Sequence, residues 1–293
     1  MTMFEGLVLG VVQGVTEFLP VSSTAHLRIV PALAGWGDPG AAFTAVLQLG
    51  TLVAVVGYFL PDLLRMVRAA LHAVRDLSRP PEPAARQLLY IVLGTLPVGI
   101  AGIAFKHHIE GSLRSLWVIS AALIIVALAL AWVERAARHS REFDDIGLRD
   151  ALIIGCAQAL ALVPGVSRSG ITLVAAMAIG LRRDAAARFS FLLGVPAIAA
   201  AGIFELKPLL KARDVSGSVL AVGLIAAAIS GYASIAWLLR FLRARSTRPF
   251  VVYRIALCCV STAVASSTAP SSHPRLVTAN PNPTNNDRYF LMG

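Results

Sequence analysis

Apolar and polar positions alternate in long blocks along the chain, with hydrophobic stretches separated by short, mostly basic connections. Six stretches approach the roughly 20 residues that a helix needs to cross a bilayer. They are residues 43–60, 88–105, 116–133, 185–204, 218–239 and 250–265. The last stretch is the least typical, because it is short and carries Arg254 near its start. The pattern predicts an all-α polytopic membrane protein with six transmembrane helices.

Two further hydrophobic stretches, residues 3–36 and 151–181, are each interrupted in the middle by a polar cluster. Pro20 breaks the first stretch, and Pro164 and Gly165 break the second. Because proline ends a helix, each stretch predicts a re-entrant helical hairpin, in which a second short arm returns to the side of entry. Irregular backbone at membrane depth is tolerated where it lines a cavity inside the protein, so both hairpin tips become candidate sites.

The composition excludes an ordinary soluble domain, since 57% of the residues are hydrophobic, 14% are charged and the mean hydropathy is +0.72. The net charge of +10 could suggest a nucleic-acid partner. The basic residues are instead spread over short connections, where they act as topology signals, so we expect no nucleic acid to bind.

With six crossings, the basic residues divide unequally between the two faces, sixteen against six. The larger set is Arg65, Arg68, Arg75, Arg79, Arg86, Arg135, Arg138, Arg141, Arg149, Arg182, Arg183, Arg188, Arg240, Arg243, Arg245 and Arg248. The smaller set is Arg28, Lys106, Arg114, Lys207, Lys211 and Arg213. The first face is therefore expected to be cytoplasmic, with both termini outside.

On this topology the first hairpin dips in from outside and the second from the cytoplasm, with three crossings between them, which predicts an inverted-topology repeat. An offset of 145 residues pairs Gly10, Gln13, Val21 and Ser22 with Gly155, Gln158, Val166 and Ser167, and sets Thr24 opposite Ser169. We expect one membrane-embedded domain over residues 1–265, with halves of about 1–133 and 134–265. A polar, disordered tail is expected over residues 266–293.

The first hairpin tip carries two ionisable residues, Glu17 and His26, within apolar surroundings, which favours a functional role. If the second arm begins as a helix at Ser22, Ser23 and His26 stand one turn apart on the same face. A hydroxyl beside an imidazole is a candidate nucleophile and base. The alternatives are helix capping by Ser22, Ser23 and Thr24, and a buried structural pair of Glu17 and His26.

The second tip combines glycines, hydroxyls and a cation in one short run, namely Gly165, Ser167, Arg168, Ser169 and Gly170. Glycines allow a sharp turn close to a ligand, while the serines and the amides of a new helix donate hydrogen bonds. Arg168 can bind a phosphate bidentately, so the tip predicts an anion site. The alternative is a salt bridge between Arg168 and Glu17, which could hold the empty site and open to the ligand.

Together the tips supply the parts that phosphoryl transfer requires: a nucleophile, a base, a cation and helix N-termini. The expected substrate is a lipid diphosphate, because the site lies among lipid-facing helices. The residues expected to bind the diphosphate are Ser22, Thr24, Gly165, Ser167, Ser169 and Gly170. Glu17 and Gln13 are the expected ligands of a divalent cation, with Mg²⁺ expected and Ca²⁺ as the alternative.

The two tips, Gln13 to His26 and Pro164 to Gly170, closely resemble the signature motifs of the undecaprenyl-diphosphate phosphatase family, also called bacitracin-resistance proteins. The similarity extends from about Phe4 to Arg254 and includes the segments 48–50 and 189–196. The resemblance implies an inner-membrane hydrolase that converts undecaprenyl diphosphate to the monophosphate and inorganic phosphate. Such an enzyme recycles the carrier lipid for peptidoglycan synthesis and confers bacitracin resistance.

The resemblance also implies roles for single residues. Ser23 would be the nucleophile, His26 its acid/base partner, and Arg168 the clamp on the diphosphate, helped by Ser167 and Ser169. Glu17 would act in metal binding or catalysis. The family fold implies six crossings and two re-entrant hairpins, with the site open to the periplasm. The chain would sit among membrane lipids, and a homodimer is left open.

A transporter is the main rival hypothesis, since inverted repeats with tips at the midplane also build alternating-access carriers. A polyprenyl-phosphate flippase would need the anion site but no nucleophile. A membrane lipid phosphatase of the other large class is disfavoured, because the chain lacks a Pro-Ser-Gly-His block. A non-catalytic scaffold would leave Glu17, His26 and Arg168 without a reason to lie in lipid.

Overall fold

The computed structural model describes residues 1–78, 80–105, 113, 115–212 and 216–268. These residues form eleven α-helices and no named strand, which confirms the all-α prediction for the described chain. The helices are α1 (Met3–Phe18), α2 (Ser23–Ala34), α3 (Gly40–Tyr58), α4 (Leu60–Arg75), α5 (Pro83–Ala104), α7 (Leu116–Ala136), α8 (Leu148–Ala159), α9 (Arg168–Ala178), α10 (Arg183–Ala212), α11 (Gly217–Ala244) and α12 (Arg248–Thr268).

Five helices, α5, α7, α10, α11 and α12, are long and apolar enough to cross a membrane. The bent pair α3 and α4 passes the same criterion when taken together, which raises the number to six. The expected crossing at 250–265, the least typical in sequence, lies in α12, whose candidate span Arg248–Ser266 is 19 residues long. The helix runs on to Thr268, three residues into the expected tail, and residues 269–293 lie outside the described part.

One connection differs from the prediction. The basic stretch 61–87 was expected to be a loop, but most of it forms α4, which is bent by 74° from α3. Its apolar residues recur at helical spacing: Met66 and Ala69 are buried, while Leu64 and Leu71 are exposed. The arginines between them concealed this amphipathic pattern. Four basic residues used for orientation, Arg79, Lys106, Arg114 and Arg213, lie outside the described residues.

Both predicted hairpins are helix–break–helix segments, α1 to α2 and α8 to α9, and the breaks are alike in backbone conformation. Ser22 and Ser167, which the 145-residue offset pairs, have left-handed φ values of 73° and 70°. Each caps the helix that follows, because its hydroxyl accepts a hydrogen bond from the amide of Ala25 or Gly170. A positive φ is uncommon for serine, so two such residues at matched positions support a repeated structural unit.

The first arm of each hairpin packs against a helix of the opposite half of the chain. Helix α1 contacts α11, and α8 contacts α5. At both crossings two glycines meet: a Cβ atom at Gly10 would overlap the carbonyl oxygen of Gly223, and one at Gly155 would overlap that of Gly94. Such small residues let the helix backbones approach closely. The two halves are therefore interlocked through equivalent glycine contacts.

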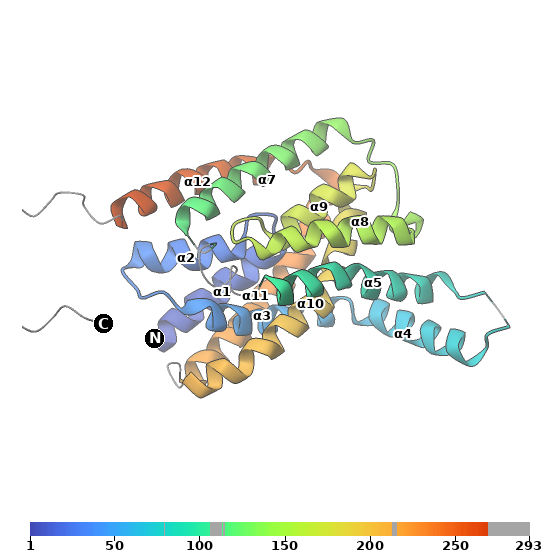
Figure 1. Ribbon diagram of the computed structural model, residues 1–293, viewed down its shortest axis with the longest axis horizontal. Coiled ribbons are helices and arrows are strands. Elements are labelled where there is room, and N and C mark those ends of the chain that lie inside the picture. Colours follow the sequence, from blue (N-terminus) through green and yellow to red (C-terminus); the bar gives the residue numbers. More distant parts are fainter. Residues whose placement is uncertain (79, 106–112, 114, 213–215, 269–293) are drawn as a thin grey trace, which may run out of the picture.

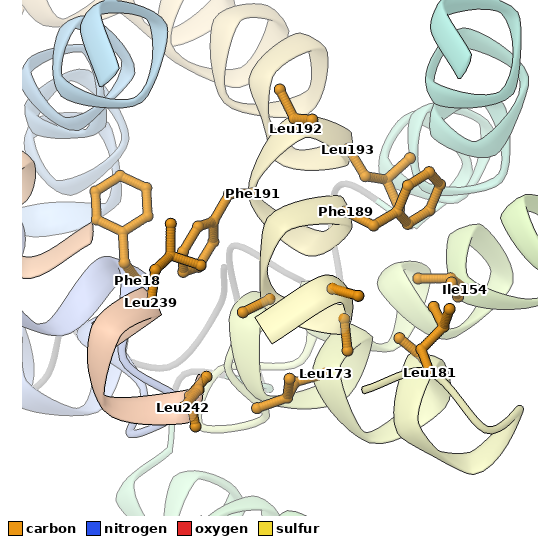
Figure 2. Packing of buried hydrophobic residues seen from close by; sticks show 14 of the residues in the cluster. Phe18, Ile154, Leu173, Leu181, Phe189, Phe191, Leu192, Leu193, Leu239 and Leu242 are labelled. Carbon is orange, nitrogen blue, oxygen red and sulfur yellow. The ribbon is translucent and has the colours of Figure 1, made fainter. Parts of the chain in front are cut away.

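Both hairpins contribute side chains to a hydrophobic cluster around α10 (Figure 2). Phe18, at the end of α1, packs edge-on against Phe191 of α10, with ring centroids 5.2 Å apart. On the other side of α10, Phe189 and Ile154 belong to the same buried cluster. In Figure 1 the start of α1 and the end of α12 lie at the left, and the α4–α5 and α7–α8 connections lie at the right.

Candidate active site

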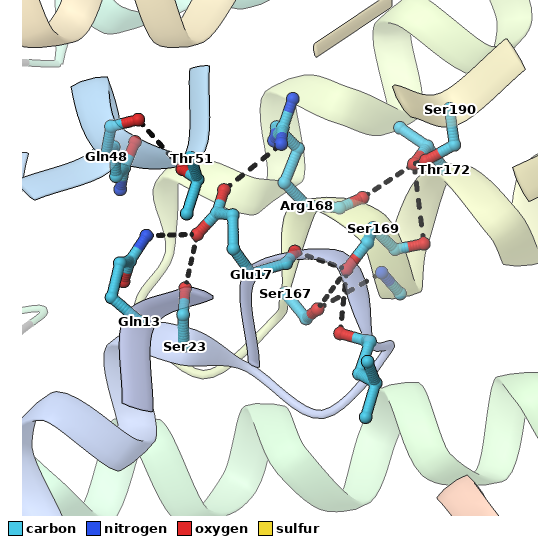
Figure 3. A network of polar contacts seen from close by, with 12 residues as sticks. Gln13, Glu17, Ser23, Gln48, Thr51, Ser167, Arg168, Ser169, Thr172 and Ser190 are labelled. Atoms are coloured by element: carbon cyan, nitrogen blue, oxygen red, sulfur yellow. Dashed lines mark hydrogen bonds and ion pairs between the residues drawn. The ribbon is translucent and has the colours of Figure 1, made fainter. Parts of the chain in front are cut away.

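Glu17 is the centre of a polar network that joins the two hairpin tips (Figure 3). It lies in the last turn of α1 and is buried. One carboxylate oxygen, Oε2, accepts hydrogen bonds from Gln13 Nε2 at 2.8 Å and from Ser23 Oγ at 2.7 Å. The other, Oε1, pairs with Arg168 Nη2 at 3.1 Å. The tips therefore meet, and the ion pair between Glu17 and Arg168, which the sequence analysis gave as the alternative to an anion site, is present.

Ser23 and His26, which the sequence places on one face of the second arm, have different hydrogen-bond partners. The Ser23 hydroxyl donates to Glu17, and both ring nitrogens of His26 lie near other groups. His26 Nδ1 is 2.7 Å from the carbonyl oxygen of Ser22, and Nε2 is 2.7 Å from the hydroxyl of Tyr253. Because a carbonyl only accepts, Nδ1 carries a proton, and the Tyr253 hydroxyl is the hydrogen-bond partner of Nε2. The prediction missed Tyr253 because this residue comes from α12, at the far end of the sequence.

Two of the three guanidinium nitrogens of Arg168 have no hydrogen-bond partner among the described residues. Nη2 bonds Glu17, while Nε and Nη1 are buried without a hydrogen-bond partner among the described residues. The guanidinium lies against α10 at Gly194, where a Cβ atom would overlap Nη1. A buried cation with unused donors is suited to an anionic ligand, since a guanidinium can bind two oxygens of one phosphate.

Several residues expected to bind diphosphate instead hold the tips together. Ser169 Oγ donates to the carbonyl oxygens of Glu17, at 3.1 Å, and Leu19, at 2.9 Å. The amide of Gly170 donates to Ser167 Oγ, which fixes the start of α9. Four of the six expected residues do not line the cavity described below, because their polar groups face other parts of the chain. These four are Ser22, Gly165, Ser169 and Gly170.

Arg254 is a residue whose structural role the sequence analysis missed. It is fully buried, and its guanidinium donates to five carbonyl oxygens. Three of these belong to the hairpin tips, at Pro20, Gly165 and Val166, and two belong to α7. The sequence showed an arginine within an apolar stretch. This was interpreted only as a reason to doubt that the stretch crosses the membrane. Arg254 therefore fastens both tips to α7.

A cavity of about 290 Å³ opens beside the network. Of the predicted site residues, its wall contains Glu17, Ser23, Thr24, Ser167 and Arg168. Four polar residues that the site prediction did not include also line it, namely Thr44, Gln48, Gln158 and Glu205. The remaining wall is apolar and comes mostly from α10 and from the segment after α8, with one residue each from α3 and α5. The cavity thus combines polar groups from both tips, from α3 and from α10 with apolar side chains.

The two predicted metal ligands, Gln13 and Glu17, are in contact with each other. Among the described residues no group of three or more His, Cys, Asp or Glu side chains is placed to hold a metal ion. Gln13 Oε1 is buried without a hydrogen-bond partner in this part of the chain, next to the Glu17 carboxylate. One carboxylate and one amide oxygen fit Mg²⁺, which takes most of its ligands from phosphate and water. The cation stays a prediction.

Comparison with known proteins agrees with these features. Residues 6–260 match the family described as "Bacitracin resistance protein BacA". The chain is 54% identical to the undecaprenyl-diphosphatase of Myxococcus xanthus, over 88% of this chain and 87% of that protein. It is 52% identical to the undecaprenyl-diphosphatase of Synechococcus elongatus, over 86% and 90% of the two chains. It is 44% identical to undecaprenyl-diphosphatase 2 of Streptomyces coelicolor, over 93% and 98%. The chain is a multi-pass membrane protein that belongs to the bacitracin resistance protein BacA family.

Proposed function

We propose that this protein hydrolyses undecaprenyl diphosphate to undecaprenyl phosphate and inorganic phosphate, the activity for which its relatives are named. One observation carries the proposal: a serine hydroxyl, a carboxylate and an arginine with unused donors share a single cavity whose remaining wall is largely apolar. The polar groups suit a diphosphate, and the apolar part of the wall suits the first part of a prenyl chain. The family name extends the proposal to bacitracin resistance.

Ser23 is the proposed nucleophile, and the geometry favours Glu17 as its base. Glu17 Oε2 already accepts a hydrogen bond from Ser23 Oγ. The two oxygens are 2.7 Å apart, within the range required for proton transfer. Ser23 Oγ attacks the terminal phosphorus, the bond from this phosphorus to the bridging oxygen breaks, and the lipid monophosphate leaves with the electron pair. Glu17 takes the Ser23 proton in this step and passes it to the leaving phosphate. A water molecule then attacks the phosphoserine and gives a proton to Glu17, the bond from phosphorus to Ser23 Oγ breaks, inorganic phosphate leaves, and the proton returns to Ser23 Oγ.

Arg168 binds the diphosphate in this scheme and stabilises the charge that develops on the phosphoryl oxygens. Its contact with Glu17 holds the guanidinium in the ligand-free site, while Nε and Nη1 remain available for the incoming anion. Glu17 and Gln13 would hold Mg²⁺, which offsets the negative charge of the diphosphate when bound. His26 acts here as a positioning residue, because it holds the carbonyl of Ser22 beside the nucleophile.

The proposed topology has six crossings, with α3 as one of them, and two re-entrant hairpins in an inverted repeat within one domain, residues 1–265. The glycine contacts and the paired left-handed serines support it. In the proposed inner-membrane orientation the cavity opens to the periplasm. It is lined by Thr44 near the start of α3, Val98 near the end of α5 and Glu205 in the second half of α10. These positions lie toward the face with few basic residues.

Phosphate release from a long-chain polyprenyl diphosphate by purified protein in detergent tests the activity. Ser23→Ala should lower turnover by about a hundredfold or more, because the nucleophile is lost. Ser218→Ala, at an exposed serine of α11 outside the cavity, serves as the matched control and should behave as wild type. Undiminished release by Ser23→Ala would refute the assignment of the nucleophile. Lipid movement across vesicles without phosphate release would favour the flippase.

A further inference from the structure

Gln158 is a buried amide at the cavity wall that nothing in the proposed reaction uses. It lies near the end of α8 and its side chain is fully buried. Neither Nε2 nor Oε1 has a hydrogen-bond partner among the described residues. Buried amides are normally paired, since an unpaired polar group costs about 1–3 kcal/mol. An exception of this kind, located at the cavity that Arg168 and Ser23 also line, requires a reason.

Comparison of the two halves shows why Gln158 is left unpaired. The 145-residue offset pairs it with Gln13, whose Nε2 donates to Glu17 four residues later. The residue four positions after Gln158 is Leu162, which cannot accept a hydrogen bond. The second half therefore retains the glutamine and lacks the carboxylate, and Leu162 and Gln158 both line the cavity.

We propose that Gln158 is a diphosphate-binding residue, whose Nε2 donates to a phosphate oxygen of the lipid substrate. The inference rests on the proposed function, since that substrate supplies the acceptor. An ionised diphosphate carries acceptor oxygens only, so it can replace the carboxylate that Gln13 has and Gln158 lacks. Gln158 then approaches the headgroup from α8, while Arg168 approaches it from α9.

The test is Gln158→Leu, which removes the amide and nearly keeps the volume. KM for a polyprenyl diphosphate should rise about tenfold to a hundredfold, with kcat changed much less, because a hydrogen bond to a charged group is lost. The melting temperature in detergent should stay the same or rise, since an unpaired buried group is removed.

Gln87→Leu is the matched control. Gln87 is also a buried glutamine, on α5, but its Nε2 donates to Asp144 at 2.7 Å, outside the cavity. Its replacement should lower the melting temperature and leave KM unchanged, the opposite of the result for Gln158→Leu.

An unchanged KM in Gln158→Leu, or a loss confined to kcat, would overturn the assignment of Gln158 provided that the wild type releases phosphate. Absence of release by the wild type would instead refute the proposed function. If Gln158→Leu does not fold, Gln158→Met gives the same comparison with an unbranched side chain of similar length. Gln158→Glu should raise KM further than either, because a carboxylate repels the diphosphate.

Discussion

The position of the Arg168 guanidinium depends on the missing side chain of Gly194. The glycine lies on α10, within the cluster of helices that surrounds the hairpins, and its Cα faces Nη1. The guanidinium can therefore lie beside the α10 backbone with two donors free. A single methyl group at this position would compete with the cation for the same space.

Gly194→Ala should displace the guanidinium and raise KM for the diphosphate about tenfold or more, since a misplaced donor forfeits a charge-assisted hydrogen bond. The control is Gly99→Ala on α5, where nothing lies within 4 Å of an added Cβ atom. Steady-state phosphate release by both purified variants checks the prediction. Equal KM values for the two variants would show that Arg168 adjusts freely.

Contacts between single residues of the site were predictable where two charged side chains lie in apolar surroundings, because an unpaired charge is unfavourable there. Glu17 and Arg168 are such a case, because neither can stay unpaired in lipid. The surroundings of His26 could not be predicted, since its partner Tyr253 arrives from another helix. Gln158 was visible as the repeat mate of Gln13, but its unpaired state follows only from the packing around it.

Helix α12 is a candidate membrane span that also carries a residue bonded to both hairpin tips. Arg254 projects from it into the space between the hairpins and α7, where its guanidinium reaches carbonyls of both tips. These carbonyls lie at helix breaks and lack the partners that a continuous helix would supply. One arginine thus satisfies the irregular backbone on which the cavity depends.

Arg254→Met should destabilise the fold by about 3 kcal/mol or more, because five buried carbonyl contacts lose their donor. Arg240→Met, at an exposed arginine of α11, should cost little. The melting temperatures of the two variants in the same detergent provide the measurement. Similar values would mean that the tips hold their shape without Arg254.

Helices and the two hairpin breaks were largely predictable, because hydrophobic length and polar clusters beside Pro20 and Pro164 indicate them. A proline alone is not sufficient, since Pro31 and Pro97 lie inside continuous helices. Helix α4 is the exception, since the arginines along it made an amphipathic helix resemble a loop. The close contacts of α1 with α11 and of α8 with α5 could not be predicted, because glycine spacing indicates a close approach without identifying the partner.

At the scale of the whole molecule, charge and cavity lie toward opposite ends. The basic connections around α4–α5 and α7–α8 gather at the right of Figure 1, away from the start of α1 and the end of α12. In the proposed orientation, which follows the positive-inside rule, that end lies in the cytoplasm. The cavity, lined by Thr44, Val98 and Glu205, then opens toward the opposite side in the same proposed orientation.

Single cysteines introduced into a cysteine-free variant test this orientation. Ser78→Cys, in the α4–α5 connection, should resist a membrane-impermeant thiol reagent added to intact cells from the periplasmic side, whereas Ser216→Cys, before α11, should react. Both serines are exposed, so accessibility depends on the side of the membrane. Labelling of Ser78→Cys alone would invert the proposed topology.

The small volume of the cavity has a consequence for where the lipid tail lies during the proposed reaction. A space of about 290 Å³ is at the lower limit of small-molecule pockets and can enclose a headgroup with a short part of its tail. The remaining hydrocarbon must stay dissolved among the surrounding acyl chains throughout the reaction. In the proposed reaction the lipid diphosphate and the lipid monophosphate therefore both stay anchored in the bilayer, which serves as the reservoir for substrate and lipid product.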